Sequence, residues 1–91
     1  MGDAIAFDWD DSNVRHLARH GVTPDEVEQF YRHDPLIVEE QLVNGEERYL
    51  ALGETDAGQR LALVFTIRRF RVRFVTAYPM TREQQEIYEE G

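Results

Sequence analysis

Apolar residues near the start of the chain recur at the three- and four-residue spacing of amphipathic helices. In the first such segment, the positions that share this spacing are Val14, Leu17 and Ala18. The acidic and hydroxyl side chains at positions 10–12 can cap its start, and Gly21 follows where helices often end. We therefore predict a helix over residues 11–20, preceded by a short edge strand over residues 5–9.

The second helix has the clearest start signal in the sequence. Thr23-Pro24-Asp25-Glu26 is a capping box with proline at the first helical position. The helix is predicted to end near Asp34-Pro35, because the residue before a proline disfavours the helical conformation. Its predicted buried stripe consists of Val27, Phe30 and Tyr31.

After Pro35 the apolar period changes from about 3.6 residues to about two, which is the period of β-strands. Asn44-Gly45 is typical of a type I′ hairpin turn, and a second capping box begins at Thr81. Residues 53–58 are polar and turn-like. Strands are predicted over residues 36–43, 48–52, 61–67 and 71–78, with 61–67 in the middle of the sheet, and a short helix over residues 82–90.

The resulting order, β-α-α-β-β-β-β-α, is typical of an α+β fold. We expect a single domain over residues 1–91. Two N-terminal helices and a C-terminal helix would pack on a four- to five-stranded antiparallel sheet. A parallel sheet, or a helix across residues 46–52, would contradict this prediction.

The charge balance narrows the classes of function. The chain has 18 acidic and 10 basic residues, a net charge of -8, and all ten cations are Arg. Such a balance argues against a general nucleic-acid coat, but not against a local basic site. There is no cysteine, which excludes disulfides, thiolate zinc sites and a cysteine nucleophile. We expect a cytoplasmic protein, because the N-terminus does not resemble a signal peptide and no apolar run could span a bilayer.

Four of the ten arginines lie within the stretch RRFRVRF, residues 68–74. Arg68 and Arg69 are expected near a hairpin tip. Strand alternation should place Arg71 and Arg73 on one side of the last strand, with Arg48 of a neighbouring strand close by. The opposite, buried side would carry Val72, Phe74 and Thr76. The arginines would form either a solvated face paired with acids such as Glu46 and Glu47, or a phosphate-binding patch.

Several sequence blocks resemble the BrnT family of toxins. The order and spacing of the blocks carry the resemblance over about residues 5–90. The blocks are Phe7-Asp8-Trp9-Asp10, Arg19-His20-Gly21-Val22, Asp34-Pro35, Glu46 to Gly53, Arg71 to Ala77, Met80-Thr81-Arg82-Glu83 and Tyr88-Glu89-Glu90. Two features depart from the family pattern: Tyr78 stands where the family usually has arginine, and the chain is strongly acidic.

The resemblance implies a RelE-like fold and a ribonuclease that arrests translation. It also implies a BrnA antitoxin with a ribbon-helix-helix DNA-binding domain, so that operator DNA is reached only through the antitoxin. RNA would be the substrate, and no metal or organic cofactor is expected.

Metal-free RNA cleavage needs a base for the 2′-hydroxyl proton, an acid for the 5′-oxygen and cations for the phosphorane charge. We expect Arg48, Arg71 and Arg73 to clamp the phosphate, with Glu47 or His20 as the base. Tyr78 and Arg69 are candidate substrate-binding residues.

Each of these roles has a structural alternative. His20 can simply interact with the helix dipole, and Tyr78 can be a packing residue. His16 and His20 have the spacing of a metal-binding pair but lack a convincing third ligand. The alternative for the whole chain is a catalytically degenerate binding module that only pairs with a partner protein.

Overall fold

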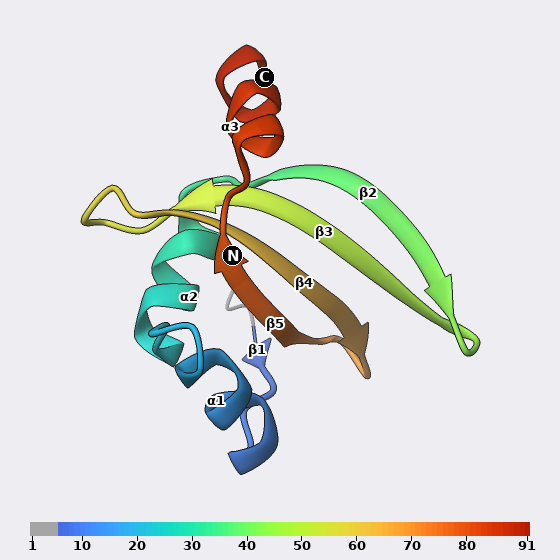
Figure 1. The fold of residues 1–91 in the computed structure, drawn as a ribbon. Coiled ribbons are helices and arrows are strands. Elements are labelled where there is room, and N and C mark those ends of the chain that lie inside the picture. The colour runs from blue at the N-terminus through green and yellow to red at the C-terminus, as the bar shows by residue number, and fades with distance from the viewer. Residues whose placement is uncertain (1–5) are drawn as a thin grey trace, which may run out of the picture.

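The computed structural model describes residues 6–91, which form three helices and a five-stranded sheet (Figure 1). The element order is β-α-α-β-β-β-β-α, as predicted. The elements are β1 Ala6–Phe7, α1 Asp11–Ala18, α2 Pro24–Arg32, β2 Leu36–Val43, β3 Glu46–Glu54, β4 Arg60–Arg68, β5 Arg71–Pro79 and α3 Arg82–Glu90. None of the helices in this part of the chain is long and apolar enough to cross a membrane.

The sheet has the spatial order β1-β5-β4-β3-β2, so β4 lies at its centre as predicted. The expectation of a purely antiparallel sheet is wrong, because β1 pairs with β5 in parallel and the sheet is mixed. Parallel neighbours cannot be joined by a tight turn, and here all the other strands separate β1 from β5 along the chain. The apolar pattern of β1 gave no sign of this direction. Residue 5 of the expected strand lies outside the described residues.

Capping residues fix the helix ends. Asp10 and Asn13 form a capping box at the start of α1, and Thr23 and Glu26 form the predicted one at the start of α2. The helix α1 ends at Ala18, two residues earlier than predicted. The amides of Gly21 and Val22 then donate to carbonyls of the last helical turn. Gly21 has a φ of +72°, so a glycine ends this helix as expected.

The helices lie on both sides of the sheet (Figure 1), with α1 and α2 on one face and α3 on the other. The larger core lies under α1 and α2, and it includes Leu17, Val27, Phe30, Leu63 and Phe74. A smaller apolar cluster lies near α3 and consists of Leu52, Ala62 and Met80, with Tyr78 and Tyr88 packed against it. The rest of the second face is less covered, which leaves it available for binding.

A β-bulge in β5 changes which residues face the helices. Phe65 of β4 pairs with Phe74, and Val64 pairs with Thr76, so Val75 is an extra residue without a partner. The expected alternation is therefore wrong beyond Phe74. Ala77, instead of Thr76, lies in the core, and Thr76 and Tyr78 lie on the same side of the sheet as Val64.

Gly53 was expected in a turn, yet it lies within β3 and is buried beneath α2. A Cβ atom at position 53 would lie 2.9 Å from Cε2 of Phe30, which is itself fully buried. Glycine therefore permits the close approach of α2 to the sheet, and β3 extends two residues beyond the predicted strand at each end.

We predict that Gly53→Ala lowers the free energy of unfolding by about 1–3 kcal/mol, because the added methyl group overpacks a buried contact. Denaturant unfolding measures this loss. Phe30→Leu provides the control, since a smaller side chain opposite position 53 makes room for the methyl group. The double variant should lose less stability than the sum of the two single variants, and strict additivity would contradict the proposed contact.

Candidate functional site

Arginines from two strands flank one small buried residue on the face that α3 only partly covers. Arg73 of β5 pairs with Thr66 of β4. The β3–β4 register, continued by one residue beyond Tyr49 and Phe65, aligns Thr66 with Arg48. Thr66 is only 1% exposed, and its hydroxyl donates to the carbonyl of Glu47 at 2.7 Å. Adjacent strands are about 4.8 Å apart, so the two arginine side chains rise about 10 Å apart across Thr66.

The adjacent row of the sheet carries two more arginines and an acid. Arg68 pairs with Arg71, and the Nε of Arg68 donates to Glu46 at 2.6 Å. This bond to Arg68 lowers the pKa of the Glu46 carboxyl. The Nε of Arg48 lies 3.5 Å from the same carboxylate but makes no hydrogen bond, although it is buried. We call the four residues Arg48, Arg68, Arg71 and Arg73 the arginine face.

Two acids from the segment between β1 and α1 hold Arg73. Its guanidinium donates to Asp10 at 2.8 Å, and Asp8 lies 3.5 Å away. The hydrogen bond from Arg73 is the main cause of the lowered pKa of Asp10. The side chain of Arg73 is therefore only 16% exposed, whereas Arg71 is exposed. An acid of a neighbouring strand was expected to pair with Arg71 or Arg73, but Glu46 pairs with Arg68 instead, and the partners of Arg73 are Asp8 and Asp10, which no local pattern indicated.

A histidine reaches the same edge of the sheet, but it is His16 and not His20. The Nε2 of His16 lies 3.1 Å from the hydroxyl of Thr76, which the bulge has turned toward the arginine face. His20 is exposed in the turn after α1. Sequence reasoning considered His16 only as a metal ligand, because the contact depends on the bulge. Among residues 6–91, no three His, Asp or Glu side chains gather as metal ligands.

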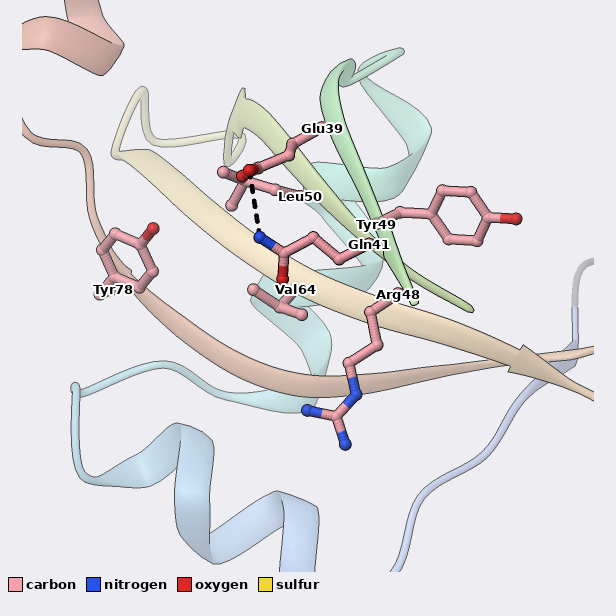
Figure 2. A pocket seen from close by; sticks show the side chains of 7 residues that line it. All are labelled: Glu39, Gln41, Arg48, Tyr49, Leu50, Val64 and Tyr78. Atoms are coloured by element: carbon pink, nitrogen blue, oxygen red, sulfur yellow. Dashed lines mark hydrogen bonds between the residues drawn. The ribbon is translucent and has the colours of Figure 1, made fainter. Parts of the chain in front are cut away.

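Tyr78 and Arg48 line the same cavity of about 160 Å³ (Figure 2). Val64 and Leu50 form its apolar part, and Figure 2 shows the ring of Tyr49 directed away from it. The hydroxyl of Tyr78 accepts a hydrogen bond from Gln84 of α3 at 3.1 Å. Tyr78 is thus a packing residue whose position also borders the arginine face.

The remaining predicted site residues lie apart from this cavity. Strand alternation directs Glu47 to the opposite face from Arg48. The charge of Glu47 accordingly raises the pKa of Tyr49, whose ring stacks on Phe65 of the core. Arg69 lies at the β4–β5 turn and lines an open depression of about 680 Å³ with Asp8, Arg68 and Arg71.

We predict that Asp10→Asn lowers the melting temperature slightly and that Asp10→Ala lowers it more. Asparagine keeps the cap of α1 but loses the charge that pairs with Arg73, whereas alanine loses both. Because the pKa of folded Asp10 is lowered, its ion pair stabilises the protein above the ordinary value of 3.8 and is lost as pH falls through the folded pKa.

Thermal melts between pH 2 and pH 7 test this. The difference in melting temperature between the native chain and Asp10→Asn should be constant at neutral pH and should disappear as the pH falls below about 4. A difference that persists at pH 2 would mean that Asp10 stabilises the fold by something other than its charge.

The sequence profile of one protein family matches residues 9–84, which span α1, α2, the four long strands and the start of α3. That family is described as the ribonuclease toxin, BrnT, of type II toxin-antitoxin systems. No curated protein sequence matches the chain. The matched region contains the arginine face, His16 and Tyr78. Because the match covers most of the chain, the protein belongs to the BrnT family of ribonuclease toxins, which implies an antitoxin as its partner.

Proposed function

We propose that this protein is a ribonuclease toxin that cleaves RNA without a metal ion and binds the scissile phosphate on the arginine face. The row Arg48–Thr66–Arg73 is the observation that carries the proposal. Two arginines lie on either side of a small residue in the strand register, and guanidinium binds phosphate through paired N–H donors. Arg71, in the adjacent row, adds a third cation for the charge of the phosphorane.

The ion pairs do not prevent this role. A guanidinium has five N–H donors, and the bonds from Arg73 to Asp10 use two of its nitrogens. The carboxylates hold the arginines in fixed orientations before the substrate arrives. Such preorganised donors stabilise a transition state more than mobile ones. The same carboxylates also compete with phosphate, so they limit the affinity for RNA.

In the proposed reaction, the 2′-oxygen attacks phosphorus and the bond to the 5′-oxygen breaks. The products are a 2′,3′-cyclic phosphate and a 5′-hydroxyl. A base must remove the 2′-hydroxyl proton, and an acid must protonate the leaving oxygen. The contact with Thr76 favours His16 for one of these proton transfers over His20, which is in the exposed turn, and over Glu47, which is on the other face.

The proposal extends to the partner. We propose an antitoxin with a ribbon-helix-helix domain that covers the toxin and carries the complex to operator DNA. A chain of net charge -8 has little attraction for DNA by itself, so a basic partner would have to supply it.

A second function is favoured by the pairing of Arg68 with Glu46 and of Arg73 with Asp8 and Asp10. If these acids never release the arginines, the chain is a binding module that pairs with its antitoxin and cleaves nothing. The proposals differ in one observable, which is cleavage of RNA by the purified protein.

We predict that Arg48→Gln with Arg71→Gln lowers the rate of RNA cleavage roughly 100-fold, because each removes a cation from the transition state. The melting temperature should stay within a few degrees of the native value, since Arg71 is exposed and glutamine preserves the stem of Arg48. Cleavage is measured on labelled RNA in the presence of EDTA. Growth arrest on expression, and its reversal by a co-expressed antitoxin, test the toxin and its partner in cells.

Arg32→Gln with Arg82→Gln is the matched control, because it removes two exposed charges elsewhere and should leave cleavage unchanged. Equal losses in both double variants would show that overall charge, and not the arginine face, governs cleavage. If the native protein alone cleaves no RNA but still binds its antitoxin, the result supports the binding module.

We predict that His16→Gln lowers the cleavage rate roughly 100-fold or more, since general acid–base groups contribute about that factor, and that His20→Gln has little effect. Glutamine can still hydrogen-bond to Thr76 but cannot transfer a proton at neutral pH. The pH dependence of the rate provides the readout, because loss of the catalytic group should remove one limb of the profile. The reverse result would assign the role to His20.

A further inference from the structure

Two of the three β-hairpins in residues 6–91 have the same kind of two-residue turn but very different residues in it. In the β2–β3 hairpin, Val43 pairs with Glu46 around Asn44-Gly45. In the β4–β5 hairpin, Arg68 pairs with Arg71 around Arg69-Phe70. The φ angles are +51° and +79° in the first turn, and +50° and +67° in the second. Both turns therefore use the left-handed conformation at both central positions.

Asparagine and glycine adopt this conformation readily, whereas a bulky side chain such as phenylalanine is strained there. The β2–β3 hairpin uses Asn44 and Gly45, the residues that adopt this conformation without strain. The β4–β5 hairpin keeps Arg and Phe in spite of the strain, so its residues do not serve the turn itself. Strain of this kind is characteristic of functional positions.

The side chains of this strained turn face solvent. Phe70 is 97% exposed, the most exposed of the large apolar residues in the described part of the chain. Its neighbours Arg68, Arg69 and Arg71 line the open depression with Asp8. The arginine face continues directly into this turn, because Arg68 and Arg71 are its last paired residues. An exposed aromatic residue between two arginines of the turn, next to a depression lined by arginines, matches the chemistry of a single-stranded nucleic acid, which has flat bases and charged phosphates.

We propose that the β4–β5 turn is a second RNA subsite, in which Phe70 stacks on an unpaired base and Arg69 contacts a neighbouring phosphate. The inference rests on the proposed function in naming RNA as the ligand. It adds the class of substrate, which is single-stranded RNA that extends beyond the scissile phosphate. Stacking does not distinguish one base from another. This subsite therefore increases the affinity for RNA and orients the strand, without sequence preference.

The surroundings of Phe70 favour RNA over a protein partner. A docking site for an apolar partner would need several adjoining apolar residues. The next exposed apolar residue, Ile67, pairs with Val72 and therefore belongs to the face opposite Arg68 and Arg71. On the side of the depression, the lining residues are all charged.

A binding experiment with a short, labelled 2′-O-methyl RNA tests the subsite, because this RNA lacks the attacking hydroxyl and is not cleaved. We expect Phe70→Asn to weaken binding roughly tenfold, and Phe70→Trp to bind at least as tightly as the native chain. The variant Arg69→Asn with Phe70→Gly recreates the turn of the other hairpin. It should melt at a higher temperature and yet bind RNA more weakly, which excludes unfolding as the cause.

Two further measurements separate stacking from charge. Replacing one base by an abasic site should weaken binding by the native protein and abolish the difference from Phe70→Asn. Arg69→Gln should lower the slope of log Kd against log salt by about 0.7, whereas Phe70→Asn should leave that slope unchanged. Leu42→Asn is the matched control, since Leu42 is 72% exposed near the other hairpin and should not affect binding.

The outcomes distinguish this inference from the proposed function. Native RNA affinity in Phe70→Asn overturns the subsite even if the protein cleaves RNA, and weaker antitoxin binding by that variant would then assign the turn to the partner protein. Binding that depends on Phe70, without cleavage of unmodified RNA, supports the subsite and overturns the nuclease. No binding of RNA by the native chain overturns both.

Discussion

The register between β4 and β5 determines the direction of most candidate functional side chains. The extra residue at Val75 lets Phe74 and Ala77 both face the helices, although they are three positions apart. It also lets Arg73 and Tyr78 both face the other side, although they are five positions apart. A regular strand would bury one member of each pair and expose the other. The bulge therefore makes it possible for one strand to complete the core and to supply both ends of the candidate site.

Acidic residues shape the arginine face as much as the arginines do. Glu46 holds Arg68, and the segment between β1 and α1 holds Arg73 with Asp8 and Asp10. Unpaired guanidiniums on adjacent strands would repel one another, and paired ones can lie close together. This explains how Arg68 and Arg73 can lie among the four arginines of residues 68–73, while the other two, Arg69 and Arg71, are exposed to solvent. In the proposed function, phosphate competes with the protein's own carboxylates, so the affinity for RNA is set by the difference between two similar interactions.

Local signals made the helices and hairpins predictable, and long-range contacts explain what was missed. Thr23 and Thr81 start their helices as predicted because a capping box involves only four neighbouring residues. Asn44-Gly45 fixed its hairpin for the same reason. The parallel direction of β1 and the bulge at Val75 depend on pairing between distant segments, which no local pattern encodes. The contacts of Asp10 and His16 with β5 were missed as a consequence, because both reach β5 from α1 or its cap.

The net negative charge of the chain and the arginine face act on a nucleic acid over different distances. At physiological salt the screening length is about 8 Å, so repulsion between the acidic surface and RNA is weak except near contact. A hydrogen bond from guanidinium to phosphate acts at about 3 Å and is little affected by charges on the far side of the molecule. Added salt relieves the repulsion that slows encounter, but it also weakens the contacts on the arginine face. For the proposed RNA ligand, net charge therefore has little effect on how often RNA arrives at physiological salt, whereas the exchange of carboxylate for phosphate at Arg73 and Arg68 governs how tightly it binds.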